Sequence, residues 1–446
     1  MFHKVLVANR GAVAARVLRT LTRMGIASVA VYSEADAGAP YLAEAGETYC
    51  IGAAPARESY LNQQALLDVV RRSGADGVHP GYGFLSENPE FATRVEQAGA
   101  RFIGPSARWL EAMGHKTRAR ELAARHGLPV GQGSPVLGDD PLQMREHARS
   151  IGFPLLVKPA GGGGGIGMLV ARDEEQLQAS VERARSMALR GFANGDVYLE
   201  KYLERPRHVE FQLLGDRHGK VRHLFDRDCS VQRRHQKVLE EACAPRVDRQ
   251  RVHALAEQIA ATFAGMGYDN IGTVEMLMGA DGSFSFLETN TRLQVEHGVT
   301  EEVTGLDLVA AQIRSAAGQA LGDILPPEVR VDGHAIEARV YAEDSRRFLP
   351  SPGTLSTFRP PRRPGIRIET GYAQGREVTT HYDPMLAKVI AHAPTREAAI
   401  DLLRDALREF DIAGVKTNLA ALDQVLSSSA FRDGDVHTGL LSELIR

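Results

Sequence analysis

The stretch 286–297 reads F-L-E-T-N-T-R-L-Q-V-E-H and continues a strand-like alternation into a dense run of polar side chains. In an extended segment, side chains at alternate positions lie on the same face. One face is therefore predicted to carry Glu288, Asn290, Arg292, Gln294 and Glu296. It offers carboxylate and amide oxygens for a hard cation, a guanidinium for an anion, and a carboxylate that can act as a base. The alternative is the solvated face of an edge strand.

The bulk properties indicate a large globular protein. The chain has 446 residues, 43% of them hydrophobic and 24% charged, which favours two to four domains with sizeable cores. The net charge of -3 indicates neither nucleic acid nor an anionic membrane as a partner.

The cysteines and the N-terminus predict a cytoplasmic location. Cys50, Cys229 and Cys243 are an odd number and form no C-x-x-C pair, which is typical of a reducing compartment. The first residues enter a strand without a signal or transit segment. No apolar run approaches the roughly 20 residues that cross a bilayer.

The N-terminal region predicts an α/β domain. Strands are expected at 4–8 and 28–32, with a helix at 12–24 between them, and the alternation continues to about residue 114. The first turn is N-R-G, so the G-x-G-x-x-G dinucleotide fingerprint is absent. The loop H-P-G-Y-G-F-L-S-E at 79–87 follows a strand, the usual place for a ligand loop in such a sheet, although an ordinary tight turn has the same composition.

Five consecutive glycines at 161–165 indicate a phosphate-binding cover. They follow a strand-like segment at 155–158 and precede a predicted helix at 174–189 and a strand at 197–201. Their backbone N–H groups are free of side chains and can fold over phosphates, with Lys116 and Lys158 supplying positive charge. The run does not match G-x-x-x-x-G-K-[ST], and a flexible turn is the alternative.

Two predicted strands at 273–278 and 283–288 flank a G-A-D-G turn, and this hairpin sets Glu275 opposite Glu288. Asn290 follows. Two carboxylates and an amide oxygen suit Mg²⁺, and without a cation a cross-strand carboxylate pair is repulsive.

Three further features have weaker signals. The segment 200–203 follows a strand and is either an adenine contact or a hinge. The segment 228–237 is predicted to be a polar loop, either binding an anion or solvated. Arg339 lies in a strand-like stretch at 334–341, and the region after 333 reads as mixed strands with a helix at 396–409.

Taken together, the motifs resemble the biotin carboxylase family of the ATP-grasp superfamily, nearly from end to end. The motifs at 227–238 and 288–297 are the most specific. The matching segments are V-L-V-A-N-R-G-A-V-A-A-R (5–16), H-P-G-Y-G-F-L-S-E-N (79–88), F-I-G-P (102–105), M-G-H-K (113–116), K-P-A-G-G-G-G-G-I-G-M (158–168), E-K-Y-L-E-R-P-R-H-V-E (200–210), R-D-C-S-V-Q-R-R-H-Q-K-V (227–238) and E-T-N-T-R-L-Q-V-E-H (288–297).

The resemblance implies a fold of three parts. These are an N-terminal α/β domain with a doubly wound parallel sheet at 1–114, an ATP-grasp domain at 115–325 with a mobile lid at about 131–203, and a C-terminal mixed β/α domain at 332–446. It also implies a reaction in which MgATP, bicarbonate and biotin give ADP, phosphate and N1-carboxybiotin. The implied partners are a biotin carboxyl carrier protein or domain, a carboxyltransferase and a second copy of the chain, with neither nucleic acid nor membrane.

The resemblance assigns roles to individual residues. ATP is expected to contact Lys116, Lys158, Gly163, Gly164, Gly165, Met168, Glu200, Lys201, Leu203, His208, Gln232, His235 and Leu277. Mg²⁺ or Mn²⁺, as a pair of ions, is expected at Glu275, Glu288 and Asn290. Bicarbonate and biotin are expected to contact Lys237, Arg292, Gln294, Val295, Tyr82 and Arg339. The catalytic residues are expected to be Glu296 as general base, with Arg292, Lys237 and Arg339.

The sequence departs from the family pattern at two positions. Ile166 stands after the glycines where acyl-CoA carboxylase members usually have Arg, which is more like the urea carboxylase branch. Gly298 follows His297 where the family usually has Pro. None of the ten methionines precedes a lysine, so the M-K-M context of biotin attachment is absent. The chain is therefore expected to be a separate subunit or a piece of a larger carboxylase.

Two other functions compete with this interpretation. Another ATP-grasp ligase, which joins a carboxylate to an amine through an acyl phosphate, would share the lid, the lysines and the metal carboxylates. It would not need Arg292, Gln294, Glu296 and Arg339 together. A catalytically silent nucleotide-binding subunit would need none of these four.

Overall fold

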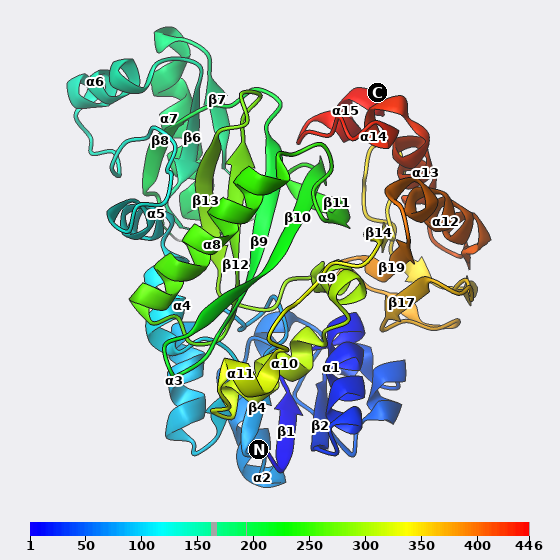
Figure 1. The fold of residues 1–446 in the computed structure, drawn as a ribbon. Coiled ribbons are helices and arrows are strands. Elements are labelled where there is room, and N and C mark those ends of the chain that lie inside the picture. The colour runs from blue at the N-terminus through cyan, green and yellow to red at the C-terminus, as the bar shows by residue number, and fades with distance from the viewer. Residues whose placement is uncertain (162–166, 193, 446) are drawn as a thin grey trace.

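The computed structural model describes residues 1–161, 167–192 and 194–445 (Figure 1). Gly163, Gly164, Gly165 and Ile166, on which the predicted phosphate cover and one family departure depend, lie outside the described residues. Within these ranges, every helix is too short or too polar to cross a membrane.

The N-terminal part is a parallel sheet covered by helices on both faces. Its strand order is β3 (Glu47–Cys50), β2 (Ala27–Tyr32), β1 (Lys4–Val7), β4 (Gly77–His79), β5 (Arg101–Phe102), with every pairing parallel. This confirms the predicted doubly wound sheet. The helices that follow strands are α1 (Gly11–Arg23), α2 (Gln63–Ser73), α3 (Pro89–Gln97) and α4 (Ala107–Gly114).

Alternation along β1 explains why its sequence is continuously apolar. Val5 and Val7 belong to the core that contains α1, whereas Leu6 and Ala8 belong to the core that contains α2 and α3. A strand buried on both faces loses the apolar–polar alternation of a half-exposed strand. The first core is completed by α10 (Leu308–Ala316), which comes from much later in the chain.

A long antiparallel sheet forms the centre of the molecule (Figure 1). In the described ranges its order is β13 (Phe284–Asn290), β12 (Ile271–Met278), β9 (Arg207–Gly215), β10 (Val221–Arg233), β11 (Gln236–Ala242), β14 (His334–Tyr341), β19 (Met385–Ala393), β17 (Ile366–Thr370). Helix α8 (Arg249–Met266) packs on β9 and β10, capped by Asp248 at its start and by Gly267 in the left-handed conformation at its end. The sheet therefore includes strands from both the predicted ATP-grasp domain, which ends at 325, and the predicted C-terminal domain, which begins at 332.

A smaller unit projects beside the central sheet (Figure 1). Strands β7 (Leu169–Ala171), β6 (Leu155–Pro159) and β8 (Val197–Lys201) form a sheet, and α6 (Pro141–Ile151) and α7 (Glu174–Phe192) pack on it around a core of their own. We call these elements the lid. Helix α5 (Lys116–Arg125) connects the lid to the N-terminal part.

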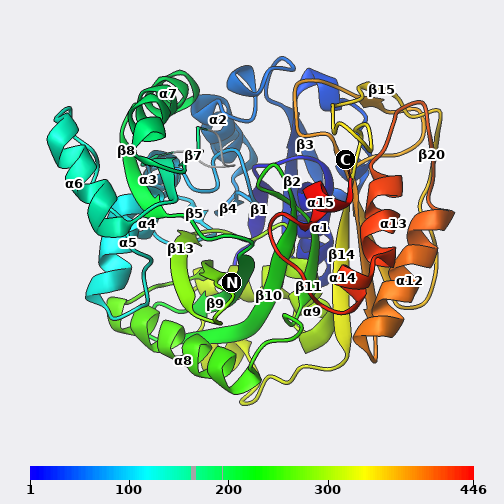
Figure 2. The ribbon, with the colours of Figure 1, turned by 90° about the horizontal axis from the view of Figure 1, so that it is seen from above.

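The C-terminal part packs on the opposite side of the central sheet from the lid (Figures 1 and 2). Helix α12 (Arg396–Glu409), capped by Thr395, packs on β19 and β14, and α13 (Leu419–Ser427) packs on α12. The remaining elements are α9 (His297–Thr304), α11 (Leu321–Ile324), α14 (Ser429–Arg432), α15 (Leu440–Leu444), β15 (Gly353–Thr354), β16 (Thr357–Arg359), β18 (Glu377–Val378), β20 (Asp411–Ala413) and short 3-10 turns at Glu34–Asp36, Pro40–Glu44 and Ala56–Glu58.

One sequence-based prediction about local structure is wrong. The polar segment 228–237 is not a loop but the end of β10 and the start of β11, joined by a tight turn at Arg234 and His235, which have φ of 49° and 66°. The polar side chains from Asp228 to Arg233 are buried rather than solvated, because partners on neighbouring strands neutralise the charged ones, whereas the turn and Gln236 are exposed. Asp228, for example, lies 2.7 Å from Arg207.

The N-terminal and C-terminal parts meet at two glycines, and this contact generates a stability prediction. A Cβ on Gly371 would lie 2.3 Å from the Cα of Gly11 at the start of α1. Gly371→Ala should therefore separate the two backbones and lower the Tm, at a cost of about 1–3 kcal/mol. Gly265→Ala in α8 is the matched control, because nothing lies within 4 Å of its Cβ. Thermal unfolding measures both, and an unchanged Tm for Gly371→Ala would contradict the proposed backbone clash.

Candidate functional site

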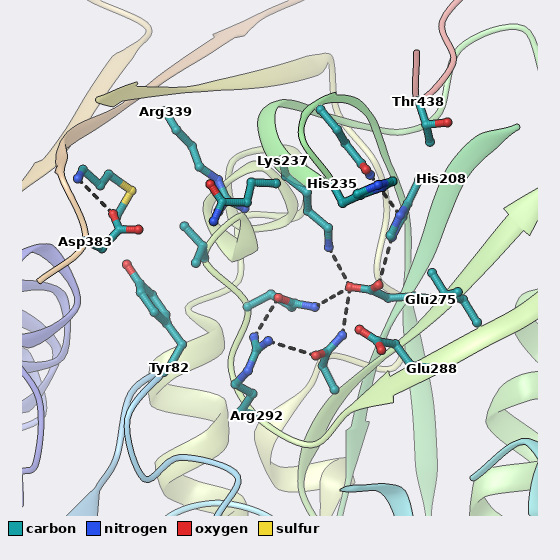
Figure 3. Close-up of a pocket in the computed structure, with 18 of the residues that line it drawn as sticks. Tyr82, His208, His235, Lys237, Glu275, Glu288, Arg292, Arg339, Asp383 and Thr438 are labelled. Carbon is teal, nitrogen blue, oxygen red and sulfur yellow. Dashed lines mark hydrogen bonds and ion pairs between the residues drawn. The ribbon is translucent and has the colours of Figure 1, made fainter. Parts of the chain in front are cut away.

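A cavity of about 840 Å³ opens where the lid, the central sheet and the N- and C-terminal parts come together (Figure 3). The structure brings almost all of the predicted site residues to its wall. They are Tyr82, Lys116, Lys158, Met168, Glu200, Lys201, Leu203, His208, Gln232, His235, Lys237, Glu275, Leu277, Glu288, Asn290, Arg292, Gln294, Val295 and Arg339. Glu296 is fully buried and lies behind this wall.

Three glutamates stand side by side across the central sheet. Glu275 of β12 is directly opposite Glu288 of β13, as the hairpin pattern predicts, and opposite Glu210 of β9 on its other side. Glu210 and Glu275 are buried. Three neighbouring carboxylates repel one another strongly where water does not screen them, so cations must lie among them.

Lys237 is the cation that two of these carboxylates, Glu210 and Glu275, share with Glu296. Its Nζ lies 2.5 Å from Oε2 of Glu210, 2.7 Å from Oε1 of Glu275 and 2.6 Å from Oε1 of Glu296. Burial by itself would lower the pKa of Lys237, but the three carboxylates hold it well above its ordinary value. The ammonium is therefore permanently charged and stabilises the ionised form of each glutamate.

His208 is the second cation of the site. Its Nε2 lies 3.1 Å from Oε2 of Glu275, and its Nδ1 lies 3.1 Å from the side-chain amide of Gln232. Burial opposes protonation, but Glu275 outweighs it and raises the pKa of His208 to about 9. The imidazole is then positively charged at neutral pH, which suits a contact with a phosphate.

A chain of polar contacts joins the alternating residues of the opening stretch. Arg292 donates to Oδ1 of Asn290 at 2.9 Å and to Oε1 of Gln294 at 2.8 Å. The amides of Asn290 and Gln294 both donate to Oε1 of Glu275. Oε2 of Glu87, in the predicted ligand loop, lies 2.9 Å from Nε of Arg292 and orients the guanidinium.

The expected strand does not extend over the whole stretch. Strand β13 ends at Asn290, and the following residues form an irregular segment that leads into α9. Asn290, Arg292 and Gln294 nevertheless line the cavity, whereas Glu296 occupies the position before α9 and reaches the site from behind. The expectation of one shared strand face is therefore correct only for Glu288 and Asn290, while Arg292 and Gln294 reach the same cavity from the irregular segment.

Glu296 is held between two cations. Its Oε1 lies 2.6 Å from Nζ of Lys237 and its Oε2 lies 2.9 Å from Nη2 of Arg339. Burial by itself would raise the pKa of Glu296, but Lys237 and Arg339 lower it below its ordinary value despite the neighbouring Glu210. Glu296 is thus ionised at neutral pH, which is the protonation state of a general base.

Two lysines in and beside the lid pair with carboxylates that line the cavity. Nζ of Lys116 lies 3.1 Å from Glu288, and Nζ of Lys158 lies 2.7 Å from Glu200. Lys201 donates to the carbonyls of Gly152 and Phe153 at 3.0 and 2.8 Å. These three lysine charges lie at the wall of the cavity.

Three residues in or beside the cavity are absent from the sequence-based set. Glu210 contacts Lys237 directly, and its signal is a single carboxylate in the apolar strand V-E-F-Q-L-L. Asp383, whose pKa is raised by burial, and Thr438 line the cavity from the C-terminal part (Figure 3). No sequence motif marks these two, because only the tertiary fold brings them to the site.

Gly298, at the start of α9, is closely packed beside the site. A Cβ at this position would lie 2.4 Å from Cδ1 of Ile390 and 3.4 Å from Oε2 of Glu337. Ile390 thus occupies the space that a larger residue would need. This departure from the family pattern adjusts the packing of α9 on β19 and removes no polar group from the cavity.

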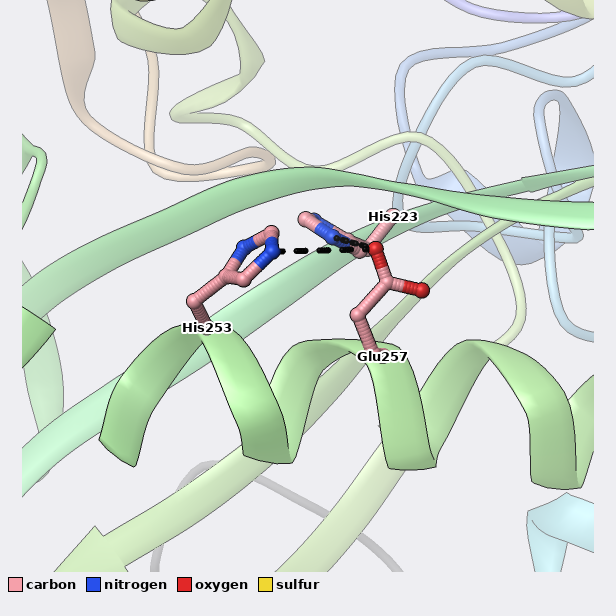
Figure 4. A group of neighbouring side chains, drawn as sticks. All are labelled: His223, His253 and Glu257. Atoms are coloured by element: carbon pink, nitrogen blue, oxygen red, sulfur yellow. Dashed lines mark hydrogen bonds and ion pairs between the residues drawn. The ribbon is translucent and has the colours of Figure 1, made fainter. Parts of the chain in front are cut away.

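A group of metal-ligand type lies outside the cavity. His223 of β10 and His253 and Glu257 of α8 point toward one another, with Nε2 of His223 3.2 Å from Glu257 (Figure 4). The backbone N–H of Phe225 donates to Nδ1 of His223, which leaves the ring proton on Nε2. Nε2 therefore donates to Glu257, and we interpret the group as a hydrogen-bonded surface cluster.

Comparisons with known proteins cover nearly the whole chain. Family models match for the biotin carboxylase N-terminal domain at residues 1–110, the carbamoyl-phosphate synthase L chain ATP-binding domain at 115–324 and the biotin carboxylase C-terminal domain at 337–443. Biotin carboxylase 2 of Bacillus subtilis is 47% identical over 99% of this chain and 100% of its own length.

Other similar proteins include a larger carboxylase subunit and a solved structure. The alpha subunit of rat mitochondrial methylcrotonoyl-CoA carboxylase is 45% identical over 99% of this chain and 62% of its own length. The biotin carboxylase domain of Hydrogenobacter thermophilus 2-oxoglutarate carboxylase, solved as a dimer with MgADP, ADP and bicarbonate, superposes with a TM-score of 0.95 at 42% identity, covering 99% of this chain and 98% of that one. With its motifs, its fold and these full-length matches in agreement, the chain belongs to the biotin carboxylase family.

Proposed function

We propose that this chain carboxylates biotin carried by a partner protein, using bicarbonate and MgATP through a carboxyphosphate intermediate. The observation that carries the proposal is the position of Glu296, an ionised base held between Lys237 and Arg339. An ATP-grasp ligase for other substrates needs the lid and the metal carboxylates but not this arrangement. The products are ADP, phosphate and N1-carboxybiotin.

The carboxylate row fits the magnesium ions that the reaction needs. Glu275 and Glu288 are directly opposite each other, and the side chain of Asn290 is adjacent. Hard oxygen donors in this number, completed by nucleotide phosphates, are the ligands that Mg²⁺ prefers. When bound, the metal would neutralise charge on the transferring phosphoryl group. We assign Glu275, Glu288 and Asn290 to this role, with Mn²⁺ as a substitute.

We assign the nucleotide to the end of the cavity beneath the lid. Lys116, Lys158 and His208 would contact phosphates, while Glu200, Lys201 and Leu203 would hold the adenine. Met168, Gln232, His235 and Leu277 complete this end, and Gly163, Gly164 and Gly165 are assigned as its cover. Closure of the lid would keep water from the labile intermediate.

Bicarbonate would lie between Glu296 and the γ-phosphate. Lys237, Arg292, Gln294 and the backbone of Val295 provide donors for its oxygens. Glu296 removes its proton, and the resulting oxygen attacks the γ-phosphorus with loss of ADP. Carboxyphosphate then gives CO₂ and phosphate, and phosphate takes the proton from N1 of biotin.

Arg339 would stabilise the biotin enolate that forms when N1 loses its proton. A fixed guanidinium aimed at developing negative charge lowers the barrier without reorganisation. Tyr82 lines the same end of the cavity, and its buried hydroxyl has no hydrogen-bond partner among the described residues, so it is available to biotin. Biotin then attacks CO₂ through N1.

The proposal includes partners, domains and location. Relatives include subunits of larger carboxylases, which supports a separate biotin carrier and carboxyltransferase as partners. We also propose a homodimer, a cytoplasmic location, and functional units at 1–114, 115–325 and 332–446 with a lid at about 131–203 that moves.

The function is tested by measuring ADP release with one component withheld at a time. Release should require bicarbonate and Mg²⁺, and biotin or a biotinylated carrier domain should accelerate it. EDTA should stop release, and added Mg²⁺ or Mn²⁺ should restore it, because the carboxylate row repels the phosphates without a cation. Release that is indifferent to both bicarbonate and biotin would favour another ATP-grasp ligase.

The base is tested with Glu296→Gln. This variant should bind ATP normally but lose biotin carboxylation by a factor of roughly 10² to 10⁴, since general bases contribute about that much. Glu257→Gln, in the surface cluster outside the cavity, is the matched control and should keep full activity. Carboxylation by Glu296→Gln at the parent rate would remove Glu296 from its assigned role.

A further inference from the structure

A group of buried charged side chains lies behind the biotin end of the cavity. Glu240 of β11 is directly opposite Glu337 of β14 in the sheet register. Arg339, two residues along β14, is directly opposite Lys388 of β19. All four are buried, with Glu240 1% and Glu337 0% exposed. Of these four, only Arg339 has a role in the mechanism above.

Glu240 and Glu296 contact different nitrogens of the Arg339 guanidinium. Nε of Arg339 lies 2.5 Å from Oε1 of Glu240, while Nη2 lies 2.9 Å from Oε2 of Glu296. Two carboxyl groups from different elements therefore fix the plane of the guanidinium. An arginine held at two edges loses little further freedom when a ligand binds, which is the preorganisation that electrostatic stabilisation requires.

Glu337 makes full ionisation of Glu240 unfavourable. Lys388 is committed elsewhere, with Nζ 2.7 Å from Glu369 and 2.5 Å from the carbonyl oxygen of Val295, and it is 3.4 Å from Glu337. Apart from the ion-pair contacts with Arg339 and Lys388, the carboxyl oxygens of Glu240 and Glu337 have no hydrogen-bond partner among the described residues. Two facing carboxylates away from water cannot both ionise cheaply, so the pair retains a proton.

The charges around Glu240 support the same conclusion. Burial is the largest effect, and Glu337 and Glu296 add to it, so the pKa of Glu240 rises to about 8 despite the opposing influence of Arg339 and Lys237. The pKa of Glu337 rises to about 7, again chiefly by burial. One face of the sheet thus holds a neutral carboxyl group next to the arginine.

We propose that Glu240 is a positioning residue for biotin carboxylation, which holds Arg339 in place through a protonated carboxyl group and so leaves its charge available to the biotin enolate. The inference rests on the proposed function. With Glu240 neutral, Glu296 is the ionised carboxylate in direct contact with Arg339 among the residues that the structure describes. When Glu296 takes the proton of bicarbonate it also becomes neutral, and the full charge of Arg339 is then exposed as the enolate forms.

Three variants separate position from charge. Glu240→Gln keeps a neutral acceptor for Arg339, whereas Glu240→Ala removes it. Glu241→Gln is the matched control, because Glu241 is also buried in β11 but points the other way, toward Arg396 at 2.7 Å and His334 at 2.8 Å. Each variant is assayed for biotin-dependent ADP release and for the slower release that needs bicarbonate but not biotin.

The expected results differ between the two assays. Glu240→Ala should lower kcat/KM for biotin by ten- to a hundredfold, on the order of the loss expected for a misplaced catalytic group. Release without biotin should fall much less than biotin-dependent release, because Arg339 contributes to it only through its contact with Glu296, which Lys237 also holds. Glu240→Gln and Glu241→Gln should carboxylate biotin nearly as fast as the parent at pH 7.

The presence of a proton on Glu240 is tested by measuring activity and stability as a function of pH. Biotin carboxylation by the parent should decline above about pH 8, where Glu240 ionises and neutralises Arg339, and Glu240→Gln should lack this decline. Stability gives a second readout that needs no activity. Between about pH 4.5 and 8, the folded parent keeps a proton on Glu240 that the unfolded chain has already released. The stability of the parent therefore falls as pH rises through that window. The Tm advantage of Glu240→Gln should therefore grow from about pH 5 to 8 and then stay constant.

Each contrary outcome overturns a defined part of the proposal. Parent-like biotin carboxylation by Glu240→Ala would remove the positioning role, and so would equal losses in both assays. A Glu240→Gln variant as impaired as Glu240→Ala at pH 7, or a Tm difference independent of pH, would show that Glu240 is ionised. Failure of the proposed function is distinguishable, because the parent itself would then show no bicarbonate-dependent ADP release.

Discussion

The contact between one lysine and three buried carboxylates is the interaction on which the site depends. Lys237 joins Glu210, Glu275 and Glu296, which come from β9, β12 and the start of α9. Removing four charges from water is costly, and their mutual attraction offsets this only when the geometry is close. The central sheet supplies that geometry by setting β9, β12 and β11 beside the start of α9. The strand pairing that forms the fold therefore also positions the charged groups of the site.

Much of the fold can be predicted from local sequence patterns, such as apolar runs, alternation and turn residues. The apolar run at 4–8 predicts a strand, which the structure confirms, and it further shows that β1 is buried on both faces, with Val5 and Leu6 in different cores. The hairpin that pairs Glu275 with Glu288 is also visible in the sequence, since its turn residues and alternation are short-range signals. The cavity collects most of the predicted site residues because their spacing places them on strands or directly after them.

The remainder depends on contacts between distant parts of the chain. Glu210 was not predicted, because its partners Lys237 and Arg227 lie on other strands and a lone carboxylate in an apolar strand has no local signature. The segment 228–237 was predicted as a loop, since polarity in sequence does not reveal that ion pairs across strands neutralise it. The role proposed for Glu240 likewise depends on the pairing of β11 with β14, about a hundred residues apart.

The continuity of the central sheet has a consequence for the labile intermediate. Lys237 and Arg339 stand on β11 and β14, which are hydrogen-bonded neighbours in one sheet. Neighbouring strands lie about 4.8 Å apart, and this spacing is fixed by backbone hydrogen bonds rather than by side-chain motion. In the proposed mechanism Lys237 binds bicarbonate and Arg339 stabilises the biotin enolate, so the two positions would be separated by a length that movement of the lid does not alter. A lid that opened to exchange nucleotide would then leave the path of the carbon atom unchanged.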